Sequence, residues 1–283
     1  RQTPLYGRVF AEVLGHATDV VSARLEAIRV MLGRPPAKAL NWGLAPHAPY
    51  TLSAAAMDQV FAFSAEHSLQ NTIHLAESAA ETRFVKEGRG IIADKLFSAA
   101  QWDPAGDPVA GCSPVQALCR AGRLRRNDLV VHGVQVGKAD IVLLRQTGCH
   151  IVLCPRSNAT LKTGKAPVID YLRADVPLSL GTDSLASAPS LSLWDELAFA
   201  RSWFAGDAPP RKWLQIATQG GARALGLQDR IGQLAVGCEA SFQVVKLPDL
   251  PGLAELEEAL CSAGEMVKVT HLYLAARNVL PER

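Results

Sequence analysis

A repeated order of strand, loop and helix most strongly limits what this chain can fold into. Short apolar segments, each followed by a polar loop and a helical pattern, occur at residues 40–45, 72–76, 129–133, 150–154 and 177–180. This alternation is typical of a parallel sheet that helices cover on both faces. It predicts an α/β fold, either an open doubly wound sheet or a (β/α)8 barrel of the TIM type. Because neither G-x-G-x-x-G nor G-x-x-x-x-G-K-[ST] occurs, nucleotide-binding open sheets are the weaker alternative.

The segments that flank and interrupt this repeat have other patterns. Apolar spacing predicts a helix over residues 4–33, and the long insertion 84–128 is expected to cover the site as a lid. Short antiparallel strands are expected further on, at 231–237, 241–247 and 267–274. We therefore expect residues 1–228 to form the barrel part and residues 229–283 to belong to a small β-sandwich.

Composition excludes several classes of function. The chain has 29 Lys and Arg residues against 27 Asp and Glu residues, so no basic surface for nucleic acid or membrane is indicated. Apolar runs such as 141–144 are far shorter than the ~18 residues that cross a bilayer. Six cysteines without a C-x-x-C pair predict the reduced, mostly buried thiols of a cytoplasmic protein. A small-molecule substrate is the expected partner.

Polar and charged side chains collect where the predicted strands end. They are His47 after the first strand, His74 and Glu77 after the second, His132 after the third, Arg156, Ser157 and Asn158 after the fourth, and Asp183 after the fifth. The carboxyl ends of parallel strands share one edge of the sheet, where barrel enzymes build their active sites. Four other histidines are expected in helices, at a strand start or in the β part and are assigned no function: His16, His67, His150 and His271.

Imidazole and carboxylate groups at these positions suit a divalent metal such as Zn²⁺ or Fe²⁺. Such an ion lowers the pKa of a bound water toward ~7, and a nearby carboxylate can then move protons. A nucleophilic mechanism through Cys154 or Ser184 is the rival chemistry, but no G-x-S-x-G motif supports it.

Five motifs occur in order along the chain: LAPHAPYT at 44–51, IHLAE at 73–77, VHGV at 131–134, CPRSN at 154–158 and LGTDSLAS at 180–187. As a set they resemble the amidohydrolase superfamily, and the resemblance extends over residues 40–250. They are most similar to the branch that holds adenosine-type, S-adenosylhomocysteine, guanine and aminofutalosine deaminases and the triazine chlorohydrolases.

The resemblance implies a metal site and a role for each residue around it. His74 and Asp183 correspond to ligands of one divalent ion per chain, Zn²⁺ or Fe²⁺, and Asp183 would also orient the attacking hydroxide. Glu77 corresponds to the proton shuttle that serves the ring nitrogen and then the departing ammonia. His132 would position the hydroxide, and His47 would contact the substrate.

The motif at 154–158 is expected to shape the substrate pocket through Arg156, Ser157 and Asn158. Arg156 could grip a carboxylate as a bidentate fork. A structural salt bridge is an equal alternative for this side chain.

One departure from the family is the lack of an H-x-H motif, which supplies two metal ligands on the first barrel strand of relatives and occurs nowhere in these 283 residues. Because the sequence also begins with Arg, we expect it to be part of a longer chain. Only the last five βα units of the barrel would then be present. The alternative is a metal-poor, inactive relative.

The expected function is metal-dependent hydrolytic deamination of an aminopurine nucleoside by a metal-bound hydroxide. Aminofutalosine, in menaquinone biosynthesis, is the first choice of substrate. The alternatives are S-adenosylhomocysteine, methylthioadenosine or guanine deamination and triazine dechlorination. A non-catalytic binding or scaffold protein is the alternative from another class. A homodimer is compatible with the resemblance.

Overall fold

The computed structural model describes residues 7–34, 40–102, 109–249 and 251–280. The chain forms two compact units, which are described separately. Unit 1 comprises Thr3–Ile151 and Arg173–Val176, and unit 2 comprises Val152–Leu172 and Pro177–Arg283. The expected domain boundary at residue 228 does not coincide with the boundary between these units, and it stays a prediction.

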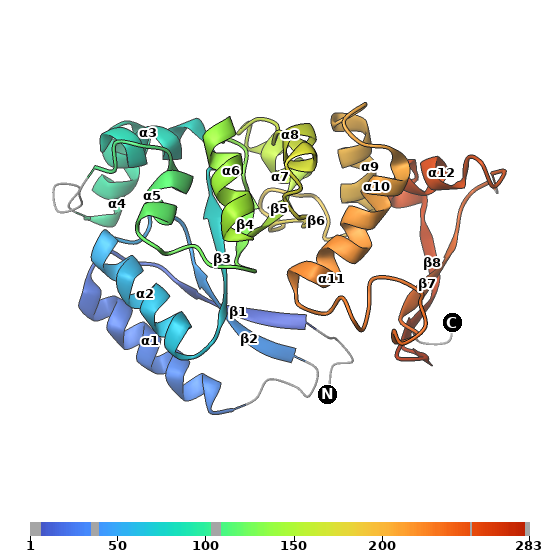
Figure 1. Cartoon of the computed structure of the whole chain (residues 1–283), viewed down its shortest axis with the longest axis horizontal. Coiled ribbons are helices and arrows are strands. Elements are labelled where there is room, and N and C mark those ends of the chain that lie inside the picture. Colours follow the sequence, from blue (N-terminus) through green and yellow to red (C-terminus); the bar gives the residue numbers. More distant parts are fainter. Residues whose placement is uncertain (1–6, 35–39, 103–108, 250, 281–283) are drawn as a thin grey trace. The chain divides into compact units, whose positions relative to one another are not determined.

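Six strands form the main sheet, and they follow one another in sequence order (Figure 1). Their bounds are β1 (Gly7–Val13), β2 (Leu40–Pro46), β3 (Gln70–Leu75), β4 (Leu129–His132), β5 (His150–Leu153) and β6 (Leu178–Leu180). The pairs β1–β2, β2–β3 and β3–β4 are parallel. The α/β class is therefore confirmed, with one strand more than the five expected.

The additional strand is β1, where a helix was predicted. β1 pairs with β2 along its whole length, from Gly7 opposite Leu40 to Val13 opposite Pro46. Valine and phenylalanine favour this pairing, and Gly15, with a φ of +135°, turns the chain before the helix begins. The prediction of a helix over residues 4–33 is thus wrong in its first half and correct in its second.

A close approach between β1 and β2 explains one glycine. Phe10 lies opposite Gly43 in the register of the two strands. A Cβ atom on Gly43 would stand 2.5 Å from the Phe10 ring, so any larger side chain would displace this aromatic residue. The glycine lets the Phe10 ring lie across the neighbouring strand.

Helices follow the strands of unit 1 as the sequence predicts. They are α1 (Thr18–Leu32), α2 (Ala54–Glu66), α3 (Ala79–Glu87), α4 (Ser98–Ala100), α5 (Pro114–Arg120) and α6 (Lys138–Thr147). The helices α1 and α2 pack side by side (Figure 1). α1 buries Val21, Leu25 and Ile28 on one face, and the hydroxyl of Ser53 caps α2 by accepting the Ala56 N–H at 3.2 Å.

The insertion 84–128 contains the end of α3, a π-helix at Ile92–Phe97, α4 and α5. Residues 103–108 lie outside the described part of the chain. A lid function for this insertion stays a prediction.

Unit 2 carries the remaining helices and a second, antiparallel sheet. Its helices are α7 (Pro155–Thr160), α8 (Val168–Arg173, which ends at the unit boundary), α9 (Leu193–Trp203), α10 (Pro210–Gln215), α11 (Gly221–Ala224) and α12 (Leu256–Ser262). The small sheet has the order β7 (Phe242–Lys246), β8 (Lys268–Leu274) and β9 (Arg277–Asn278). The strands expected at 241–247 and 267–274 are confirmed. The one expected at 231–237 is wrong, because Gly232 and Gly237 both have φ above +90° and the segment forms turns.

Two predictions about the whole chain can be compared with the structure. All six cysteines are free, and four of them are buried: Cys112, Cys149, Cys154 and Cys261. A membrane crossing requires a longer and more apolar helix than any in the described part of the chain.

Candidate active site

Main-chain hydrogen bonds tie the ends of neighbouring strands together in unit 1. The N–H of His47 donates to the carbonyl of Val13 at 3.0 Å, and the N–H of His74 donates to the carbonyl of His47 at 3.0 Å. The N–H of Gly133 donates to the carbonyl of Leu75 at 3.1 Å. These bonds extend the sheet pairing by a residue or more past the strands, so the candidate side chains lie at one edge.

Three of the predicted site residues come together at this edge. The Nδ1 atom of His74 lies 2.9 Å from Nε2 of His132, and this nitrogen lies 3.6 Å from Oε1 of Glu77. Each of the three side chains offers a ligand atom, and these atoms all lie within 4.8 Å of one another. The His132 side chain is 1% exposed and that of Glu77 is 14% exposed. Two imidazoles and one carboxylate that converge in this way form a donor set that fits Zn²⁺ or Fe²⁺.

His47 lies beside this group and has a hydrogen-bond contact with Thr51. Its ring centroid is 5.3 Å from that of His74. The Oγ1 atom of Thr51 lies 2.9 Å from Nδ1 of His47 and 3.1 Å from the carbonyl oxygen of Ala48.

Glu81 supports the turn that carries Glu77, and the sequence reasoning missed it. Its Oε1 accepts the N–H of Ala76 and its Oε2 accepts the N–H of Glu77, each at 2.7 Å. The side chain is fully buried. Burial and the nearby Glu77 charge raise the pKa of the Glu81 carboxyl to about 7, although the backbone donors oppose this shift.

Tyr50 is a second residue that the sequence reasoning missed. Burial raises its pKa to about 12, and the charges of Glu81 and Glu77 add to this rise. Its ring centroid lies 6.5 Å from that of His47. Tyr50 therefore stays a neutral hydrogen-bonding group beside the histidines at neutral pH.

His16 was expected in a helix, and this expectation is wrong. It follows the end of β1, because Gly15 has already turned the chain there. Its ring stacks on Trp102 with a centroid distance of 4.4 Å and meets Phe97 edge-on at 4.7 Å. These contacts join the end of β1 to the insertion.

The other predicted site residues lie in unit 2. Oδ2 of Asp183 accepts hydrogen bonds from the hydroxyls of Ser157 at 2.6 Å and Ser187 at 2.9 Å. Ser157 and Asn158 are buried in α7. Asp183 and Ser157, which lie at the ends of two successive predicted strands, are thus brought into direct contact.

Arg156 forms the structural salt bridge that was the alternative to a substrate contact. Its backbone N–H and Nε donate to the two carboxylate oxygens of Glu196, at 2.8 and 2.6 Å. Its terminal nitrogens donate to the hydroxyl and the carbonyl of Ser190, at 3.0 and 2.8 Å. Because the side chain is buried and its donors are used within unit 2, we no longer assign it to the substrate.

Three residues at or near strand ends have a left-handed backbone conformation. Ala76, His132 and Asp183 have φ values of +53°, +74° and +59°. This conformation costs a non-glycine residue about 1–3 kcal/mol and is enriched at functional sites. Histidine and aspartate are among the residues that adopt this conformation more often than most, whereas the sequence carries no signal for it at Ala76.

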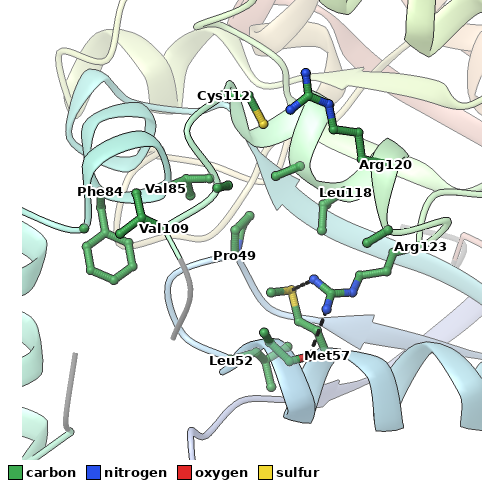
Figure 2. A pocket seen from close by; sticks show the side chains of 15 residues that line it. Pro49, Leu52, Met57, Phe84, Val85, Val109, Cys112, Leu118, Arg120 and Arg123 are labelled. Atoms are coloured by element: carbon green, nitrogen blue, oxygen red, sulfur yellow. Dashed lines mark hydrogen bonds between the residues drawn. The ribbon is translucent and has the colours of Figure 1, made fainter. Parts of the chain in front are cut away.

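An apolar cavity of about 370 Å³ lies behind the loop that carries His47. Figure 2 shows Pro49 and Leu52 of this loop on one side and Phe84 and Val85 of α3 on the other. The guanidinium of Arg123 donates to the carbonyl of Ala54 at 2.9 Å and contacts Sδ of Met57 (Figure 2). The four site residues of unit 1 do not line this cavity: His47, His74, Glu77 and His132.

Comparison with known proteins finds one matching family and relatives that are named as deaminases. Residues 19–273 match the profile described as the amidohydrolase family. The chain is 34% identical over 231 residues to a 5-methylthioadenosine/S-adenosylhomocysteine deaminase of Desulforudis audaxviator, covering 80% of this chain and 49% of the relative. It is 33% identical over 230 residues to an aminodeoxyfutalosine deaminase of Deinococcus radiodurans, covering 78% of this chain and 55% of the relative. The chain thus spans about half the length of these relatives.

Solved structures agree with the fold. A zinc-bound adenosine deaminase from Xanthomonas campestris has a TM-score of 0.78 and 28% identity, covering 98% of this chain and 61% of that one. The aminofutalosine deaminase of Helicobacter pylori has a TM-score of 0.84 and 21% identity, covering 99% of this chain and 69% of that one. The latter similarity concerns the fold alone.

Proposed function

Because the chain belongs to the amidohydrolase family, we propose that it is the main catalytic part of a metal-dependent deaminase. The reaction replaces the amino group of a purine-like ring by oxygen and releases ammonia. The observation that carries this proposal is the convergence of His74, Glu77 and His132 within 4.8 Å at the carboxyl edge of the sheet. Relatives named as deaminases support the same reaction class.

Of the three converging donors, His74 would hold the metal, together with Asp183 as the family resemblance implies. Glu77 and His132 would act on the attacking oxygen and its protons. A divalent ion bound there would supply hydroxide at neutral pH, since it would lower the pKa of a bound water toward ~7. The hydroxyls of Ser157 and Ser187 both donate to Oδ2 of Asp183, which keeps this carboxylate oriented. Zn²⁺ and Fe²⁺ both suit such ligands.

Glu77 moves the protons in this proposal. It takes the proton from water and gives it to the ring nitrogen, while the hydroxide oxygen forms a bond to the ring carbon. The remaining proton of the added oxygen then passes through Glu77 to the amino group, the C–N bond breaks, and ammonia and a ring carbonyl result. His132, whose Nε2 lies 3.6 Å from the Glu77 carboxylate, positions the attacking oxygen.

His47 is retained as a substrate contact. Its Nδ1 is engaged with Thr51, so Nε2 would form the hydrogen bond with a polar group of the substrate. Ser157 and Asn158 are buried in α7. They are uncharged and would contribute to the shape of the substrate pocket.

Aminofutalosine and the adenosine thioethers are the two substrate choices. The engagement of Arg156 with Glu196 removes the reason to prefer a substrate that carries a carboxylate. We keep aminofutalosine as first choice because the motifs at 154–158 and 181–187 most resemble deaminases of this substrate. Relatives named for the two choices match at nearly equal identity, 33% and 34%. A cytoplasmic location and a homodimer stay predictions.

The test is ammonia release by the full-length natural protein, loaded with Zn²⁺ or Fe²⁺, from a panel of substrates. The panel contains aminodeoxyfutalosine, methylthioadenosine, S-adenosylhomocysteine, adenosine and guanine. Turnover of one or more of these supports the proposal and selects the substrate. Metal-loaded protein that releases no ammonia from any of them would point to a non-catalytic relative and overturn the proposal.

A further inference from the structure

We propose that Glu81 is a positioning residue that fixes the peptide between Ala76 and Glu77 and thereby aims the Glu77 carboxylate at His132. This inference rests on the role proposed for Glu77. It assigns no contact between Glu81 and the substrate or the metal.

The two oxygens of Glu81 each hold one N–H group of the turn. Oε1 accepts from Ala76 and Oε2 accepts from Glu77, both at 2.7 Å. A buried carboxylate is costly unless donors satisfy it. The complete burial of Glu81 is therefore understandable only with both of these bonds in place.

The same peptide unit is also held from its other end. The carbonyl of Ala76 accepts the N–H groups of Val134 and Gln135, at 2.8 and 2.7 Å. These two residues lie just after β4, two and three positions beyond His132. The Ala76–Glu77 peptide is thus fixed between Glu81 on one side and the His132 loop on the other.

This fixation is needed because the turn is strained. Ala76 adopts a φ of +53°, which an alanine rarely does without support from its surroundings. If the peptide rotated to relieve this strain, the Cα–Cβ bond of Glu77 would point in another direction. The 3.6 Å separation between the Glu77 carboxylate and His132 depends on this peptide orientation.

Helix capping alone does not account for Glu81. Ser78 is the N-cap of α3, and its hydroxyl accepts the N–H of Glu81 at 3.2 Å. In a capping box the glutamate at this position accepts the N–H of the capping serine itself. Glu81 has this contact with the Ser78 N–H as well. Its two 2.7 Å bonds, however, reach past Ser78 to the two residues before it, which belong to the site and not to the helix.

The first experiment measures how well the amides of the turn are protected from exchange, and it does not depend on activity. Hydrogen–deuterium exchange of the wild-type protein should show slow exchange at the Ala76 and Glu77 amides, and Glu81→Gln should accelerate it there. Glutamine keeps one acceptor oxygen for one of the two N–H groups, but its NH2 group would face the other N–H and cannot accept a hydrogen bond from it. Fast exchange of both amides in the wild type overturns the proposal, even if the variant does not fold.

The second experiment measures turnover. Glu81→Gln should lower kcat about 10–100-fold, as for other residues that orient a catalytic group, with an unchanged metal content and nearly unchanged KM. In a Glu77→Gln background the same substitution should have little further effect, because Glu81 acts through Glu77. An unchanged kcat, or an equal further loss in that background, contradicts the proposal.

Ser78→Ala is the matched control. It removes the cap of α3 but leaves both bonds between Glu81 and the turn, so it should lower Tm and leave kcat unchanged. If the wild type deaminates nothing, the turnover experiment fails with the proposed function, whereas the exchange experiment still decides whether Glu81 holds the turn.

Discussion

His74 and His132 lie on neighbouring strands β3 and β4, and their facing nitrogens are 2.9 Å apart. The register alone does not produce this contact, since Leu75 pairs with His132 and His74 pairs with Val131, and regular alternation would direct the two histidines to opposite faces. His132 ends β4 with a left-handed φ of +74°, which departs from that alternation. Two imidazole nitrogens at this distance, with a carboxylate oxygen 3.6 Å from one of them, are suited to holding a cation. The following predictions examine this arrangement and the residues around it.

Substitution His74→Ala should abolish metal binding, because the family resemblance makes His74 a ligand and its Nδ1 lies within the converging donor group. Elemental analysis of the purified full-length protein should find about one equivalent of metal in the wild type and almost none in the variant. His271→Ala, which alters an exposed histidine of β8, is the control and should retain the metal. Equal metal content in the wild type and His74→Ala would remove His74 from the ligand set.

Glu77→Gln should retain the metal and lose most of its turnover. Glutamine has nearly the same shape but cannot carry a proton, and proton transfer by a positioned group contributes ~10²–10⁴-fold to the rate. Steady-state ammonia release together with elemental analysis separates the two effects. A rate close to that of the wild type would assign the proton shuttle to another residue.

Asp183→Asn should reduce both metal content and turnover, because the resemblance makes Asp183 a ligand and an orienting group. Ser157→Ala removes only the 2.6 Å hydrogen bond to Oδ2 and should have a smaller effect on both quantities. Elemental analysis and kcat of the two variants together distinguish Asp183, as a metal ligand, from Ser157, as a residue that orients it. The reverse order of effects would contradict these roles.

Arg156→Ala should destabilise the protein without a specific effect on substrate binding. Its partner Glu196 would remain buried without a counter-charge, which typically costs about 3–5 kcal/mol. The free energy of unfolding from urea titration measures this loss, with Arg211→Ala, an exposed arginine of α10, as the control. If Arg156→Lys instead raised KM only for a substrate that carries a carboxylate, the substrate role of Arg156 would be restored.

Alkaline pH should weaken the fold through two buried thiols. Burial raises the pKa values of Cys149 and Cys261 from an ordinary value of 9.0 to about 12. The unfolded chain therefore loses these protons at lower pH than the folded chain, so the stability that they contribute is complete below pH ~9 and declines as the pH rises toward 12. Unfolding titrations between pH 7 and 11 should show a smaller decline for Cys149→Ala than for Cys238→Ala.

The sequence predicted most of the sheet and the three residues that converge in unit 1. Strands β2 to β6 are short apolar segments bounded by polar loops, so their pattern is local, and His74, Glu77 and His132 stand at their ends. β1 was missed because Val9 and Val13 suit a helix as well as a strand, and only pairing with β2 decides between them.

The rest depends on pairings that are distant in sequence or on backbone angles. Glu196 lies 40 residues after Arg156, so no local pattern indicates their salt bridge. The left-handed φ of Ala76 and the reach of Glu81 to the peptide before it likewise appear only in three dimensions. The motif Ser78-x-x-Glu81 resembles an ordinary helix cap in sequence.

The main-chain bonds that join the strand ends have a consequence for how such a site can diversify. Because the carbonyls of Val13, His47 and Leu75 hold the next strand end through backbone N–H groups, the spacing between adjacent positions is independent of the side chains placed there. A histidine can therefore be exchanged for another residue at one position while its neighbours keep their places. Selection for a new substrate can then proceed one position at a time on an unchanged backbone template.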